Sequence, residues 1–82
     1  MIEKQVRDLI EGPIQEMGID VDNVEYVKEG SNYFLRITID RAQPIDVDTC
    51  VEVTHVVNPI LDEADIIKDS YILDISSKEK GD

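Results

Sequence analysis

Two runs of alternating apolar and polar residues, one on either side of a short turn signal, restrict the fold more than any other feature of the chain. The runs are residues 24–28 and 33–40. Alternation with a period of two is typical of strands that bury one face, and glycine, serine and asparagine between two such runs favour a chain reversal. The pattern therefore predicts an antiparallel hairpin. Its turn signal consists of Glu29, Gly30, Ser31 and Asn32.

The four turn residues also set the register of this hairpin. With a loop of that length, Glu25 faces Arg36 as a cross-strand charge pair, and Phe34 lies beside Val27. A one-residue slip would mix apolar and charged residues on both faces, which supports this register. We expect the face with Glu25, Arg36 and Phe34 to point away from the core. The opposite face is expected to belong to the core and to carry Val24, Tyr26, Leu35, Ile37 and Ile39.

Apolar residues at spacings of three and four predict a first helix over residues 2–17. Gly18 supplies its C-terminal stop. Pro13 removes one helical hydrogen bond and is expected to kink or divide the helix near Gly12. The apolar stripe consists of Ile2, Val6, Leu9, Ile10, Pro13, Ile14 and Met17.

A second helix is predicted over residues 47–61, with Asp46 as its expected N-cap and Asp48 as the rival N-cap. The valine content lowers helix propensity slightly, but the spacing and the cap favour a helix over a strand. Pro59 should loosen its last turn. The stripe expected to be buried consists of Val47, Cys50, Val51, Thr54, Val57, Ile60 and Leu61.

A third strand is predicted over residues 70–76, and residues 78–82 form a polar tail to a domain of residues 1–77. The order helix, strand, strand, helix, strand predicts an α+β domain of two layers, with both helices on one face of a three-stranded sheet. A crossover through the second helix would place the third strand parallel to the second, in the sheet order 1-2-3. This topology is similar to that of type II KH domains.

Acidic side chains outnumber basic ones by nineteen to eight, which gives a net charge of −11. Such a chain repels a bare phosphate backbone and attracts basic partners. The alternative is that the acidity only keeps the protein soluble. Cys50 is the single cysteine, which excludes an internal disulfide and a four-cysteine zinc site. Neither a membrane-length apolar run nor a signal peptide is recognisable. We therefore expect a cytoplasmic protein without membrane contact.

Few residues suggest chemistry. His55 is the only histidine, and Cys50 lies on the apolar stripe of the second helix, where cysteine usually acts as a small hydrophobe. Asp40, Asp46 and Asp48 are compatible with a divalent-cation site, but the glycine and glutamate of an EF-hand loop are missing and helix capping accounts for two of them. We expect no enzyme activity, cofactor, metal or small-molecule substrate, and a small metal-dependent enzyme is the weaker alternative.

Taken together and in order, these segments resemble the N-terminal domain of the ribosome maturation factor RimP family. Residues 24–36 resemble the first hairpin of that domain, and residues 71–77 resemble its last strand. Pro13 and Pro59 stand where members commonly carry proline. The residues that resemble its second strand and second helix are Ile39, Asp40, Ile45, Asp48, Cys50, Val53, Leu61 and Asp62.

The chain departs from the family pattern at three places. Thr49 replaces an acidic residue, and His55 stands where arginine is common. After Ser77 the usual proline-glycine pair and basic stretch are missing. The SH3-like domain that normally follows is absent from these 82 residues, so we expect a truncated form that need not carry the whole activity of the family.

The resemblance implies a non-enzymatic role in assembly of the small (30S) ribosomal subunit, in which this domain contacts the ribosome and a basic ribosomal protein is installed. The acidity favours a basic ribosomal protein as the direct partner. The alternative is a KH-like RNA-binding module that contacts rRNA, although the Gly-x-x-Gly clasp of KH domains is missing. The expected partner-binding residues, each of which can also be a solvated charge or a cap, are Glu25, Glu29, Phe34, Arg36, Asp40, Asp46 and Asp48.

Overall fold

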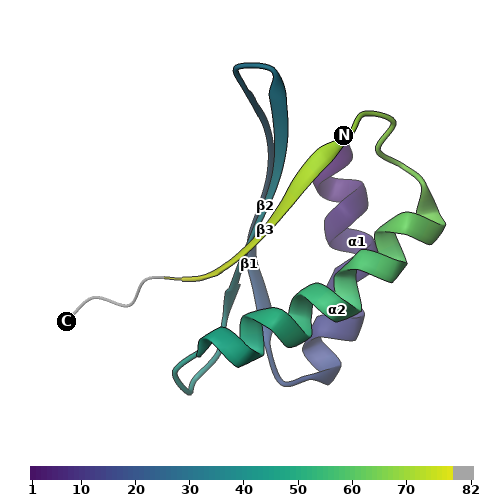
Figure 1. Cartoon of the computed structure of the whole chain (residues 1–82). Helices are drawn as coiled ribbons and strands as arrows, with labels where there is room; N and C mark the ends of the chain where they lie inside the picture. The colour runs from purple at the N-terminus through teal and green to yellow at the C-terminus, as the bar shows by residue number, and fades with distance from the viewer. Residues whose placement is uncertain (79–82) are drawn as a thin grey trace.

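The computed structural model describes residues 1–78, so the greater part of the expected polar tail, residues 79–82, lies outside the described residues. Two helices lie on the same side of a three-stranded sheet (Figure 1). This confirms the expected α+β class and element order. The elements are α1 (Ile2–Glu16), β1 (Asp20–Glu29), β2 (Asn32–Asp40), α2 (Val47–Ala64) and β3 (Tyr71–Ser77).

The sheet has the order β1-β2-β3, in which β2 pairs antiparallel with β1 and parallel with β3. The hairpin register is the one that the turn predicts, since Val24 lies opposite Ile37 and Glu25 opposite Arg36. The core-facing side is also confirmed, with Tyr26 half-buried at its margin. The buried hydrophobic residues are Val6, Ile10, Ile14, Ile19, Val21, Val24, Leu35, Ile37, Ile39, Val53, Val57 and Leu61.

Strand β1 begins four residues earlier than the alternation predicts, at Asp20. The pairing with β2 is irregular between Val21 and Asn23, and an extra residue at such a bulge interrupts the period of two. Val21 and Val24 are both buried although they lie three residues apart. The bulge therefore hides the first part of the strand from a search for strict alternation.

Helix α1 runs through Pro13 without being divided, contrary to one of the expected outcomes. The proline costs one backbone hydrogen bond, but Ile10 and Ile14 on either side of it are fully buried against the sheet layer and hold the helix together. Gly18, at φ +79°, ends the helix as predicted. Its N–H donates to the Gln15 carbonyl, and the Ile19 N–H donates to the Ile14 carbonyl, which is a Schellman ending.

Asp46, not Asp48, caps α2. One carboxylate oxygen of Asp46 accepts hydrogen bonds from the backbone N–H of Thr49 at 2.8 Å and from its hydroxyl at 2.7 Å. The helix extends through Pro59 and ends three residues later than predicted, where Asp65 adopts a left-handed conformation at φ 50°. The Asp65 N–H donates to the Leu61 carbonyl and closes this end.

The buried stripe of α2 differs from the predicted one. The helix buries Thr49, Val53, Val57 and Leu61, whereas Val47 is 77% exposed and Val51 is 48% exposed. The sequence offers two overlapping apolar stripes, and the polar Thr49 makes the correct one look less favourable. Its burial is possible because its hydroxyl has a hydrogen-bond partner in Asp46.

Neighbouring substitutions on β2 distinguish the two faces of the sheet. Leu35 is fully buried, so Leu35→Ala should lower the free energy of unfolding by about 2–5 kcal/mol. Phe34 is half-buried on the other face, and Phe34→Ala should cost only roughly 1 kcal/mol. Urea denaturation followed by circular dichroism measures both. Equal losses, or a larger loss for Phe34→Ala, would contradict the assignment of the faces.

The cap predicts a dependence of stability on pH. The two hydrogen bonds from Thr49 lower the pKa of Asp46 below its ordinary value of 3.8. Since the folded-state pKa is lowered, the stabilisation is fully present above pH 3.8 and is lost as pH falls through the lower pKa. Asp46→Ala should therefore melt below the wild type at pH 6, and the difference should shrink in acid. Asp48→Ala is the control without a cap bond, and an equal effect of both would contradict the assignment.

Candidate partner-binding surface

The face of the sheet that points away from α1 and α2 carries an apolar row across all three strands. The strand registers place Val27 opposite Phe34, and Phe34 beside Ile72. Val27 and Phe34 are half-buried, and Ile72 is 48% exposed. This row, Val27, Phe34 and Ile72, is called the apolar row below. It brings together residues from β1, β2 and β3 on the face that neither helix covers.

A charged row lies directly beside the apolar row. It consists of Glu25 on β1, Arg36 on β2 and Asp74 on β3, again placed side by side by the strand registers. The Arg36 guanidinium donates to both carboxylate oxygens of Glu29, at 2.9 and 3.1 Å, and lies 3.9 Å from the Asp74 carboxylate. Two carboxylates therefore pair with one guanidinium, and with Glu25 the open face is net negative.

Arg36 also covers part of the apolar row. Its guanidinium carbon is 5.1 Å from the centre of the Phe34 ring, within the range of a cation–π contact. The register confirms the prediction that Phe34 points away from the helices, and its ring is half-buried. The stacking accounts for part of this cover and holds the guanidinium in a fixed place.

The expected ion pair between Glu25 and Arg36 is not formed, although the two residues are opposite each other. Because the guanidinium stacks on Phe34, it reaches past the apolar row to Glu29 near the hairpin tip. Glu25 instead accepts a hydrogen bond from the Asn23 side-chain amide at 3.0 Å. Its carboxylate is exposed, so it remains accessible to a partner.

Three of the seven sequence-predicted contact residues lie away from the apolar row and the charged row. Asp40 ends β2, is half-buried rather than exposed, and accepts a hydrogen bond from the Arg41 N–H at 2.9 Å. Asp46 is exposed but holds the start of α2, and Asp48 is exposed in the first turn. Glu25, Glu29, Phe34 and Arg36 therefore lie together on the open face, whereas Asp40 lies at the end of β2 and Asp46 and Asp48 lie at the start of α2.

Ile72 and Asp74 complete the open face, and neither is among the contact residues predicted from the sequence. The alternation within β3 was the available signal, because Ile72, Asp74 and Ser76 must share one face. What the sequence does not supply is the parallel register between β3 and β2, since no turn connects these strands. That register alone places Ile72 next to Phe34 and Asp74 next to Arg36.

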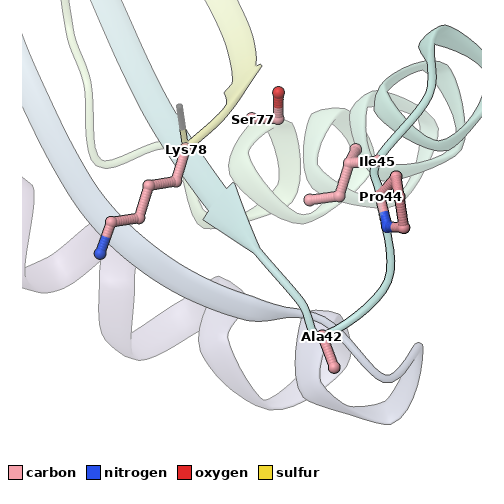
Figure 2. Close-up of a pocket in the computed structure, with 5 residues that line it drawn as sticks. All are labelled: Ala42, Pro44, Ile45, Ser77 and Lys78. Atoms are coloured by element: carbon pink, nitrogen blue, oxygen red, sulfur yellow. The ribbon is translucent and has the colours of Figure 1, made fainter. Parts of the chain in front are cut away.

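A hollow of about 270 Å³ lies at another place, between the β2–α2 connection and the end of β3. Figure 2 shows Pro44 and Ile45 across from Ser77, with Ala42 below them. The Lys78 side chain runs away from Pro44 and Ile45 (Figure 2), and its ammonium group lies 3.4 Å from the Asp22 carboxylate. The hollow is thus lined mainly by apolar side chains.

The residues that the sequence offered as candidates for chemistry do not gather into one cluster within the described part of the chain. Within residues 1–78, there is no group of three or more histidine, cysteine, aspartate or glutamate side chains that could hold a metal ion. His55 is exposed on α2, and Cys50 is half-buried. Neither of the two helices has the length and apolar character needed to cross a bilayer.

Comparison with protein families identifies a match to a known domain. The model of the RimP N-terminal domain matches residues 9–78, which include all of β1, β2, α2 and β3 and most of α1. The match covers well over half of the chain and both rows of the open face. The chain therefore belongs to the RimP N-terminal domain family, a family of ribosome maturation factors.

Proposed function

We propose that this chain binds the small (30S) ribosomal subunit during its assembly, through a basic ribosomal protein that docks on the open face of the sheet. The observation that carries this proposal is the composition of that face, where carboxylates on β1 and β3 flank an apolar row. Membership in a family of ribosome maturation factors supplies the biological setting.

The two rows of the open face have different tasks in this proposal. The apolar row supplies contact area, and burial of its partly exposed side chains favours association by about 25 cal/mol per Å² before the costs of binding. The carboxylates supply long-range attraction to a cationic surface, which raises the association rate and depends on salt. Arg36 opposes this attraction only weakly, because its charge is compensated by Glu29 and Asp74.

Contact with rRNA is the competing possibility, and the element order similar to type II KH domains is what favours it. The net charge of −11 counts against it, because binding to a phosphate backbone draws on basic groups. The cations of the open face do not offset this, since Arg36 is paired with carboxylates. We therefore favour the protein partner, and the experiment below separates the two.

Neutralising two acids of the open face should weaken binding. We expect Glu25→Gln combined with Glu29→Gln to lower the affinity for purified small subunits roughly tenfold at low salt, since the variant loses electrostatic attraction. The matched control is Glu16→Gln with Glu63→Gln, which removes the same charge from exposed positions at the ends of α1 and α2. Sedimentation of the chain with small subunits through a sucrose cushion measures the bound fraction.

Free basic ribosomal proteins of the small subunit and short rRNA fragments serve as separate baits in the same series. The proposal is supported if the affinity for a basic protein is highest for the wild type, lower for the control and lowest for the open-face variant. Equal losses of affinity in the two double variants would show that only net charge matters and would count against the open face as the binding site. A tight gel shift with rRNA at moderate salt, or no binding to small subunits at low salt, would overturn it.

A further inference from the structure

Strand β3 is an edge of the sheet, and one side of its backbone has no strand partner within residues 1–78. The Lys78 N–H donates to the Ile39 carbonyl at 2.7 Å, on the side of β2. Because successive amides of a strand point to opposite sides, the N–H groups of Leu73, Ile75 and Ser77 point to the free edge. These groups form a regular series of donors and acceptors that is open to another strand.

The two edges of the sheet differ in how they are protected. Folded proteins commonly block an edge with a bulge, a proline or charged side chains. The edge strand β1 has the irregularity between Val21 and Asn23 and carries several acids. In contrast, β3 pairs with β2 in an unbroken register from Tyr71 to Ser77, contains no proline, and carries one charged residue, Asp74.

Helix α2 borders this free edge with apolar side chains. Val47 and Val51 lie one helical turn apart, and Asp62 lies three turns beyond Val51 on the same side of the helix. Helix α2 packs against β3, and its start lies by the end of that strand, at the hollow between Ile45 and Ser77. Val47 and Val51 are exposed there, 77% and 48% respectively, and Leu73 is only half-buried.

The hollow described above closes one end of the same border. Its walls are Pro44 and Ile45 before α2 and Ser77 at the end of β3 (Figure 2). Strand β3 and helix α2 run in opposite directions, so the start of α2 lies by the end of β3. A strand laid along β3 would therefore pass Val51 and Val47 and reach the hollow, whose volume of about 270 Å³ accommodates an apolar side chain.

The charges around this edge favour a basic occupant. Asp48 and Glu52 are exposed on α2, and Asp62 and Asp69 are exposed near the start of β3. The nearby lysines are compensated, since Lys78 pairs with Asp22 and Lys68 with Asp65. A second copy of the chain would bring a further net charge of −11 to the same place, and a nucleic acid would bring phosphates. Both would be repelled by the acids around the edge.

We propose that the free edge of β3, together with the flank of α2 at Val47 and Val51, binds an extended basic polypeptide segment as a fourth strand of the sheet. Backbone hydrogen bonds to β3 supply affinity, and alternate apolar side chains of the segment pack toward α2. The site is separate from the open face, and its test requires no ribosomal component. Either proposal can therefore fail while the other stands.

The test uses the 82-residue chain and a peptide of about nine residues that alternates lysine and valine. Amide exchange and ¹⁵N–¹H NMR spectra are recorded with and without the peptide. We expect new protection of the amides of Leu73, Ile75 and Ser77, whereas those of Ile72 and Asp74 are protected already by β2. Unchanged protection, shifts confined to the open face, or dimerisation without peptide binding would overturn the proposal.

Control peptides separate the contributions of charge and backbone. A peptide with glutamate in place of lysine should not bind, because the carboxylates around the edge repel it. A fully N-methylated lysine–valine peptide keeps charge and side chains but has no backbone donors, and it should also fail to protect these amides. Equal binding of the N-methylated peptide would contradict addition of a strand.

Two variants test the site itself. Val51→Ser should weaken peptide binding roughly tenfold by removing apolar contact, whereas Gln15→Ser, at an exposed position near the end of α1, should leave binding unchanged. Ser77→Pro removes an outward N–H at an exposed edge position, where proline is tolerated, and should abolish protection of the neighbouring amides. The spectra report whether each variant is folded, and wild-type binding by both folded variants would exclude this edge.

Discussion

A single layer of helices covers the sheet, and the rest of the molecule depends on that one-sided burial. Side chains alternate between the faces of a strand, so burying Leu35, Ile37 and Ile39 beneath α1 and α2 necessarily turns Phe34 and Arg36 outward. The core therefore decides the composition of the opposite surface. The hairpin turn selects the register, and the register assigns each residue of β2 to the core or to the surface.

The distribution of charge follows from the same arrangement. Within residues 1–78, no charged side chain is buried in the core. The acidic excess is therefore displayed on the open face, on the outer sides of the helices and around the edge of β3. Several cations are engaged with carboxylates, among them Arg36 with Glu29 and Lys78 with Asp22. Exposed pairs of this kind contribute little stability. Their effect is to reduce the positive charge available to repel a basic partner.

The sequence was informative where a local signal fixes the geometry, and misleading where a tertiary contact decides. The hairpin register follows from four turn residues, and the cap at Asp46 follows from its place before an apolar stripe. The early start of β1 is hidden by its bulge. The choice between two apolar stripes of α2 depends on a buried hydroxyl at Thr49, and the partner of Arg36 depends on stacking with Phe34. Neither the buried stripe of α2 nor the partner of Arg36 can be predicted from the spacing of residues in the sequence.

Hydroxyl-radical footprinting of the chain, free and bound to purified small subunits, tests the central claim most directly. In the free chain, Phe34 and Ile72 should be oxidised, whereas Leu35 and Ile37 stay unmodified beneath the helices. On binding, oxidation of Phe34 and Ile72 should fall. Oxidation of Leu35 and Ile37 in the free chain, or unchanged oxidation of Phe34 and Ile72 in a complex that does form, would contradict an open sheet face that receives the partner.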